Sequence, residues 1–323
     1  MIIQGDALTI LKTLPDESVD CVVTSPPYFG LRDYQVNGQL GLEPNIHTYL
    51  EKLLSIFDGV KRVLKPTGTC FVNLGDSYSG SGKGGGDTGL SKERYRPELL
   101  NYKTNRGVKP STKTGLPSKC QCCVPERFVI GMVEHGWLKR NTIIWHKINC
   151  MPQSAKDRFT NDFEYVFFFV KSSNYYFGQQ FDPLSPATIA DVRNETGRHT
   201  YKDSKYQDSV GDPDKPSWYR GKTFVNSEQG RNKRCVWSIP TAPCKEAHFA
   251  TFPPDLIRPM ILAGCPKDGT VIDIFSGAGT TGLVCKQLSR KFIGIELNPE
   301  YVKIANKRIG FNLDNWLKGE KEC

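Results

Sequence analysis

"TVIDIFSGAGTTGLVCKQLSRKFIGIEL", residues 270–297, decides the fold of this chain. An apolar run that contains Asp273 leads into a turn of small residues, and apolar positions at helical spacing follow to about Leu288. A second apolar run then ends on Glu296. A strand, a tight turn, a helix and a second strand form a unit in which the two strands run parallel.

The same alternation of strands and helices extends through the rest of the chain. Further strands are predicted at 1–5, 21–25, 68–76, 141–147 and 165–172, and further helices at 7–14, 47–64, 125–135, 252–264 and 299–309. This order predicts an α/β fold, a doubly wound and mostly parallel sheet with helices on both faces.

The composition is that of a globular protein, since 38% of the 323 residues are hydrophobic and 24% are charged. No run approaches the roughly 18 to 20 apolar residues of a membrane helix, and no secretory signal is present, so we expect a cytoplasmic protein without membrane contact. The eleven cysteines are expected to be free thiols. The cluster Cys120, Cys122 and Cys123 has only Cys150 as an obvious fourth ligand, so we predict no metal site.

Positive charge is concentrated in two polar segments of a chain whose net charge is +9. Residues 83–119 hold nine lysines and arginines against three acidic residues, and residues 193–245 hold eleven against six. Such segments suit the binding of a polyanion, while solvated loops without a ligand are the plainer interpretation.

The turn after the 270–273 strand has the features of a ligand-binding loop. Gly277 and Gly279 allow a sharp turn and a close approach of the backbone to a ligand. Thr280 and Thr281 come at the start of the next helix, where free N–H groups are available. Glu296 ends the following strand and is placed to bind ribose hydroxyls, so we predict a nucleoside cofactor.

A second motif, "TSPPY" at 24–28, follows the predicted strand 21–25. Ser25 is held by two consecutive prolines, Pro26 and Pro27, which fix the backbone, and the aromatic Tyr28 comes next. The pattern favours a rigid turn that aims a hydroxyl group and an aromatic ring at a ligand.

Taken together, "TSPPY" and "DIFSGAGTTG" resemble motifs of the S-adenosylmethionine-dependent DNA amino-methyltransferases. The catalytic motif precedes the cofactor loop, which resembles the beta group of that family, a circular permutation of the usual methyltransferase order. "IIQGDAL" at 2–8 looks like the element that binds the adenine ring through Asp6. The resemblance covers most of residues 1–76, 120–172 and 247–310.

The resemblance implies a domain plan. Residues 1–172 would form the catalytic half, with a flexible basic loop at about 77–119. Residues 173–246 would form a target-recognition insert, and residues 247–323 the cofactor-binding half.

The resemblance also implies S-adenosyl-L-methionine as the cofactor and a set of residues that bind it. These are Asp6, Asp273, Phe275, Ser276, Gly277, Gly279, Thr280, Thr281 and Glu296.

The chemistry of amino methylation explains the catalytic motif. The exocyclic nitrogen of cytosine or adenine is a weak nucleophile because its lone pair is delocalised into the ring. Two acceptors for its N–H groups, Ser25 Oγ and the Pro26 carbonyl, would favour the tetrahedral shape of the transition state. Pro27 would keep the turn rigid, and Tyr28 would stack on a base taken out of the duplex.

Ser25 as the first letter of the motif is typical of cytosine-N4 enzymes, whereas aspartate or asparagine is commoner among adenine-N6 enzymes. We therefore predict a site-specific cytosine-N4 methyltransferase, with adenine-N6 methylation as the alternative. A cytosine-C5 enzyme would use a cysteine after a proline, and Pro243-Cys244 offers one, but the Glu-Asn-Val strand of that family is missing. A non-catalytic nucleic-acid-binding protein with the same fold is the alternative of another class.

Double-stranded DNA is the expected partner, and a restriction endonuclease the expected functional partner of a bacterial or phage-encoded enzyme. Basic residues interleaved with aromatic ones in 193–245 suit DNA contact. The residues proposed to contact phosphates or base edges are Arg220, Lys222, Arg231, Lys233 and Arg234.

Overall fold

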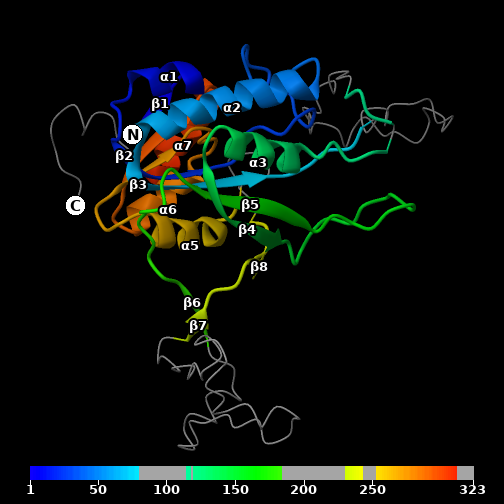
Figure 1. Cartoon of the computed structure of the whole chain (residues 1–323). Coiled ribbons are helices and arrows are strands. Elements are labelled where there is room, and N and C mark those ends of the chain that lie inside the picture. Colours follow the sequence, from blue (N-terminus) through cyan, green and yellow to red (C-terminus); the bar gives the residue numbers. More distant parts are fainter. Residues whose placement is uncertain (80–113, 118, 184–229, 243–251, 311–323) are drawn as a thin grey trace, which may run out of the picture. The chain divides into compact units, whose positions relative to one another are not determined.

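The protein is described from a computed structural model, which defines residues 1–79, 114–117, 119–183, 230–242 and 252–310 (Figure 1). Two units are distinguished: residues 1–178 with 235–323, and residues 179–234. In the described part of the second unit, β6 (Phe181–Asp182) pairs antiparallel with β7 (Arg231–Asn232). The predicted residues Arg220, Lys222 and Cys244 lie outside the described residues, as do 80–113 of the predicted basic loop.

The first unit is built on a sheet of eight strands in the order β1-β10-β9-β2-β3-β5-β4-β8. The strands are β1 (Ile2–Gln4), β2 (Val19–Thr24), β3 (Leu64–Leu74), β4 (Leu138–His146), β5 (Phe163–Val170), β8 (Val236–Ser238), β9 (Thr270–Asp273) and β10 (Lys291–Glu296). β5 runs antiparallel to β3 and β4, and the other pairs are parallel. The predicted mostly parallel sheet is confirmed.

Helices cover both faces of this sheet, as the doubly wound prediction requires (Figure 1). One face carries α1 (Ala7–Thr13), α2 (Ile46–Val63) and α3 (Val124–Glu134). The opposite face carries α5 (Pro254–Gly264) and α6 (Thr280–Gln287), and α7 (Pro299–Ile309) packs against α6 and β10. Among the described helices, none is long and apolar enough to cross a membrane.

A buried apolar core lies between each helical layer and the sheet. The α2 face contributes residues spaced three and four apart, such as Leu53, Phe57 and Val60, which are fully buried. On the other face, Leu256 and Ile261 of α5 are also fully buried. Strands buried on both faces read as continuous apolar runs, which is why the sequence marked them so clearly.

The N-terminal strand takes the place that the permuted order predicted. β1 pairs in parallel with β10, with Ile3 opposite Ile295. The N-terminal ammonium group donates to Phe292 O at 3.0 Å. Strands from the two ends of the described chain are thereby neighbours in one sheet.

Two details differ from the sequence-based expectations. β3 begins at Leu64, and the predicted turn before residue 68 is a register irregularity inside this strand, between the pairs Val19–Leu64 and Cys21–Thr69. β8 was not predicted, and it joins the main sheet beside β4 although its residues fall within the predicted insert 173–246. The role of that insert stays a prediction.

Candidate active site

The carboxyl ends of β1, β10, β9 and β2 meet at one edge of the sheet, because these four strands are parallel neighbours. A cavity of about 560 Å³ opens there. Its walls include Asp6 after β1, Ser25 after β2, Phe275 and Gly277 after β9, and Glu296 at the end of β10. Ser25 of the TSPPY motif and Gly277 of the glycine turn, about 250 residues apart in sequence, therefore line the same cavity, as predicted.

A buried hydrogen bond joins the two motifs directly. Thr24 Oγ1 donates to Asp273 Oδ1 at 2.7 Å, and Thr281 Oγ1 donates to Asp273 Oδ2 at 2.6 Å. The Phe275 backbone N–H also donates to Oδ1, at 3.1 Å. Asp273 is fully buried and does not line the cavity, and burial raises its pKa to about 6 despite the three donors. Its carboxylate holds β2, the turn and α6 together.

The two glycines of the turn have different surroundings. Both have a left-handed backbone, with φ of 50° at Gly277 and 75° at Gly279. A Cβ atom at Gly277 would meet nothing closer than Phe275 O at 4.0 Å, whereas one at Gly279 would lie 2.7 Å from Ala305 Cβ in α7. Gly277 therefore leaves room beside the cavity, and Gly279 lets α7 approach α6.

The other predicted residues of this turn do not line the cavity. Ser276, Thr280 and Thr281 are buried. Thr280 Oγ1 accepts a hydrogen bond from Arg308 at 3.2 Å. These residues support the loop and the start of α6 from the buried side, away from the cavity.

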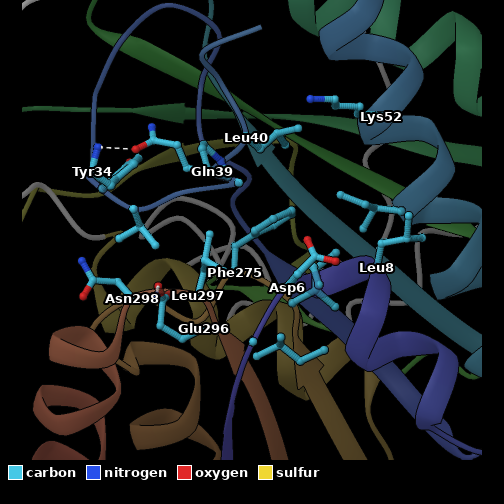
Figure 2. A pocket seen from close by; sticks show the side chains of 18 of the residues that line it. Asp6, Leu8, Tyr34, Gln39, Leu40, Lys52, Phe275, Glu296, Leu297 and Asn298 are labelled. Carbon is cyan, nitrogen blue, oxygen red and sulfur yellow. Dashed lines mark hydrogen bonds between the residues drawn. The ribbon is translucent and has the colours of Figure 1, made fainter.

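Two carboxylates, at the ends of the neighbouring strands β1 and β10, face the cavity (Figure 2). Glu296 accepts hydrogen bonds from the Gly277 N–H at 2.7 Å and from the Asn298 N–H at 2.8 Å, and burial raises its pKa. Asp6 caps α1, because its Oδ1 accepts from the Thr9 N–H at 2.8 Å. Each carboxylate keeps lone pairs for hydroxyl or amino donors, so the walls suit a nucleoside.

The segment after the catalytic motif forms another wall of the cavity, which sequence analysis did not indicate. Tyr34 and Gln39 line the cavity, and the Tyr34 N–H donates to Gln39 Oε1 at 2.7 Å (Figure 2). The Tyr34 ring meets the edge of Tyr301 from α7 at a centroid distance of 6.4 Å. Glu43, nearly fully buried, accepts from the Gly41 N–H at 2.8 Å and fixes the base of this segment.

The TSPPY motif is held from several sides. Tyr49 of α2 donates its hydroxyl hydrogen to Pro27 O at 2.9 Å, so this carbonyl group already accepts a hydrogen bond within the protein. Ser25 and Pro27 line the cavity, while Pro26 is buried and, like Tyr28, does not line it. A Cβ at Gly75 would lie 2.6 Å from the Tyr28 ring, so the backbone of Gly75 packs closely against this ring.

A polar network of side chains from β3, from β5 and from the residue after β4 lies beside the motif, and sequence analysis did not find it. Ser25 Oγ and Tyr28 Oη each lie 3.3 Å from Asn73 Oδ1. Tyr28 Oη donates to Glu164 Oε2 at 2.7 Å, and Lys147 forms an ion pair with the other oxygen of Glu164. Burial, followed by the nearby Glu164 carboxylate, raises the pKa of Tyr28, so its phenol stays protonated.

Comparison with known proteins agrees with this geometry. The sequence profile of the N6_N4_Mtase family, described as DNA methylase, matches residues 19–307. The chain belongs to the N6/N4 DNA methylase family. It is thus a DNA methyltransferase that uses S-adenosylmethionine as the methyl donor. The predicted family and cofactor are confirmed.

Several relatives share most of their length with this methylase. Type II methyltransferase M.Cfr9I of Citrobacter freundii is 40% identical over 307 residues, which cover 95% of this chain and 86% of the relative. Type II methyltransferase M.SmaI of Serratia marcescens is 37% identical over 308 residues, which cover 95% and 90%.

Solved structures share the fold of this methylase. PvuII DNA methyltransferase, a cytosine-N4-specific enzyme, aligns with a TM-score of 0.58 and 21% identity, and the alignment covers 97% of this chain and 86% of that one. TTHA0409 of Thermus thermophilus, a modification methylase solved with S-adenosyl-L-methionine, aligns with a TM-score of 0.54 and 20% identity over 96% and 92% of the two chains.

The described DNA-contact candidates of the methylase lie in the second unit. Arg231 is exposed on β7. Lys233 Nζ lies 3.5 Å from Asp182 Oδ1, and the Arg234 N–H donates to Asp182 Oδ2 at 3.2 Å. Asp182 thus holds Lys233 and Arg234 at one place on this small antiparallel pair.

Proposed function

We propose that this methylase transfers the methyl group of S-adenosylmethionine to the exocyclic N4 of cytosine at a specific site in double-stranded DNA. The observation that carries the proposal is the cavity that Ser25 and Gly277 share, beside the Thr24–Asp273 hydrogen bond that joins their strands. A methyl acceptor beside Ser25 and a methyl donor beside Gly277 would then be neighbours.

The cavity walls fit the donor. Glu296 would hold the ribose hydroxyls, Asp6 the adenine amino group, and the backbone at Gly277 would lie against the aminoacyl part, where the missing side chain leaves room. When bound, S-adenosylmethionine would supply a methyl group on a sulfonium: the amino nitrogen would bond to the methyl carbon, the carbon–sulfur bond would break, S-adenosylhomocysteine would leave, and the nitrogen would release a proton. Phe275, Ser276 and Gly279–Thr281 would support this site, and Asp273 would act on it through the turn.

Ser25 is proposed to accept a hydrogen bond from the target amino group. Its neighbour Asn73 Oδ1 is an acceptor only, so the Ser25 hydroxyl hydrogen points to Asn73 and the oxygen lone pairs are left for the amine. The Pro26 carbonyl would be the second acceptor, with Pro27 and Tyr49 keeping the turn in place. Two acceptors aimed at the two N–H groups favour the tetrahedral nitrogen of the transition state.

Cytosine is favoured over adenine because serine begins the motif. Serine at this position is typical of the cytosine-N4 enzymes, whereas aspartate or asparagine is commoner among the adenine-N6 enzymes. The target base would leave the duplex and stack on Tyr28. Adenine-N6 methylation remains the second candidate, since the same two acceptors would serve that amino group.

Site-specific modification beside a restriction endonuclease is the proposed setting. It is supported by the relatives, which are named type II methyltransferases. Arg231, Lys233 and Arg234, together with Arg220 and Lys222, are proposed to contact the DNA.

One assay tests the reaction and the base together. The full chain is incubated with labelled S-adenosylmethionine and duplex DNA, and the DNA is digested to nucleosides. N4-methylcytosine is expected. N6-methyladenine would select the alternative, and an unlabelled digest, obtained with duplexes of many sequences, would favour the non-catalytic interpretation.

Ser25→Ala tests the motif. The variant should lose at least about 100-fold in kcat, since it removes one group that stabilises the transition state, while cofactor affinity stays close to the wild-type value. Unchanged turnover would exclude Ser25 from the mechanism. Ser173→Ala, at an exposed serine that does not line the cavity, is the matched control and should leave kcat unchanged.

A further inference from the structure

We propose that Glu164 is a positioning residue for methyl transfer: its carboxylate fixes the amide of Asn73, and that amide makes Ser25 an acceptor toward the target amino group. The proposal rests on the function proposed above and deepens it. Glu164 touches neither the cavity nor Ser25, and its effect would pass through Asn73.

Glu164 reaches the catalytic motif because β5 is reversed relative to its neighbours. β5 begins at Phe163 and runs antiparallel to β3, with Tyr165 opposite Leu74 and Val166 opposite Asn73. The start of β5 therefore lies beside the end of β3, at the edge where β2 also ends. The Glu164 side chain is 17% exposed and forms an ion pair with Lys147, which follows β4 and is 20% exposed.

The contacts of Asn73 determine which way its amide faces. Asn73 Nδ2 donates to Glu164 Oε2 at 3.1 Å and to Tyr165 O at 3.0 Å. Both partners accept and neither can donate, so the opposite orientation would place the amide oxygen against a carboxylate and a carbonyl group. Asn73 Oδ1 must then face Ser25.

The orientation of Ser25 follows from that of Asn73. Asn73 Oδ1 cannot donate, so the 3.3 Å contact requires the Ser25 hydroxyl to donate its hydrogen. The remaining lone pairs of Ser25 Oγ are the ones that an amino group needs. A reversed amide would offer Nδ2 to Ser25 Oγ, and one of those lone pairs would be occupied.

Tyr28 is fixed by the same carboxylate. Its single hydroxyl hydrogen goes to Glu164 Oε2, which is nearer at 2.7 Å than Asn73 Oδ1 at 3.3 Å and carries charge. One oxygen of Glu164 thus receives hydrogens from both Asn73 and Tyr28, and Lys147 holds the other. Glu164 is the point at which the serine and the aromatic ring of the motif are both set.

The test is a double-mutant cycle between Glu164→Gln and Ser25→Ala, measured as single-turnover methyl transfer to DNA with saturating cofactor. Glu164→Gln leaves one acceptor oxygen among three donors. The charged Lys147 should take that oxygen, so the amide N–H₂ faces Asn73 and Tyr28, which lose their acceptor. We expect the rate to fall about 30- to 100-fold in the wild-type background, and less than about threefold in the Ser25→Ala background. S-adenosylmethionine affinity should change by less than about twofold in both.

Matched controls separate positioning from folding. Glu17→Gln removes an exposed carboxylate from a different lysine pair, Glu17–Lys171, and should leave the rate unchanged. Asn73→Ala removes the intermediate group and should show the same dependence on Ser25 as Glu164→Gln does. If Glu164→Gln does not fold, Asn73→Ala replaces it in the double-mutant cycle with Ser25→Ala.

Equal losses in the two backgrounds would overturn the inference, because Glu164 would then act independently of Ser25. An unchanged rate in Glu164→Gln would overturn it as well. A wild-type chain that methylates no amino group of DNA would overturn the proposed function, and this inference with it. An active wild type with additive losses would remove only the inference.

Discussion

Asp273 ends β9 with its carboxylate inside the protein, where Thr24, Thr281 and the Phe275 N–H donate to it. Three hydrogen bonds favour the charged form, but complete burial opposes it more strongly. The result is a raised pKa in a group that joins the end of β2 to the turn after β9. The free energy of unfolding should therefore depend on pH through this carboxyl group.

A pH series of unfolding measurements tests this. Burial raises the pKa of Asp273 from 3.8 to about 6, so between those values the folded state binds a proton that the unfolded state has released. The contribution of this group to stability is full below about pH 4 and is lost as pH rises to about 6, by about 3 kcal/mol in total. Asp273→Asn should remove that slope from the urea-unfolding free energies.

The control for this series is Asp268→Asn at an exposed aspartate, which should keep the wild-type slope. Parallel pH curves for wild type and Asp273→Asn would show that Asp273 is not the group responsible.

At the same scale, sequence analysis found the residues that belong to motifs and missed their supports. Ser25 and Gly277 were predictable because they stand in short patterns with a chemical meaning. Asn73 and Glu164 stand within apolar strands, "TCFVNL" and "FEYVFFF", and no local pattern marks them. Their partners lie 48 and 136 residues away, so only the folded sheet brings them together.

At the scale of the elements, the two glycines of the turn between β9 and α6 have different structural roles. Gly279 is packed against Ala305 of α7, and Gly277 faces open space. Helix packing thus depends on Gly279, and room for a ligand depends on Gly277.

Alanine at each glycine should separate these roles. Gly279→Ala combines a left-handed backbone with a clash and should lose about 2 to 3 kcal/mol of unfolding free energy. Gly277→Ala should lose only about 1 kcal/mol but weaken S-adenosylmethionine binding by about tenfold or more, since the new methyl group enters the space left for the ligand. Urea unfolding and calorimetric titration measure the two effects. Wild-type cofactor affinity in Gly277→Ala would argue against binding at this turn.

Element boundaries were predictable where periodicity or turn chemistry is local. α3 was expected to begin at Pro125, and it spans Val124–Glu134. Its N-terminal cap was not expected, because Cys123 has a left-handed backbone and the acceptor is Asp76, which receives the N–H groups of Cys123 and Val124 at 3.0 and 3.1 Å. A cap supplied from 47 residues away has no signature in the flanking sequence.

For the whole molecule, strand order was predictable and charge placement was not. The permuted arrangement followed from two motifs whose order in the chain is reversed, and β1 beside β10 confirms it. The two basic segments of a chain with a net charge of +9 suited either an anionic partner or solvated loops, and the family identifies DNA as the substrate. Which cations meet phosphate depends on side-chain positions that composition does not contain.

Salt titration of DNA binding tests one of them. Arg231→Ala should reduce the slope of log affinity against log salt by about one, because one phosphate contact is lost. Lys303→Ala, at an exposed lysine of α7 that pairs with Glu300, is the control and should leave the slope unchanged. Identical slopes for all three proteins would remove Arg231 from the DNA-contact set.

The reversed direction of β5 has a consequence for how functional residues are sought in folds of this kind. In a sheet whose strands all point the same way, inspecting the residues that come after each strand is enough. A strand that runs antiparallel to the others brings its first residues to the edge where the parallel strands end, as Glu164 illustrates. A survey of such proteins should therefore read every antiparallel strand from its beginning, where polar side chains are otherwise dismissed as the entry to a hairpin.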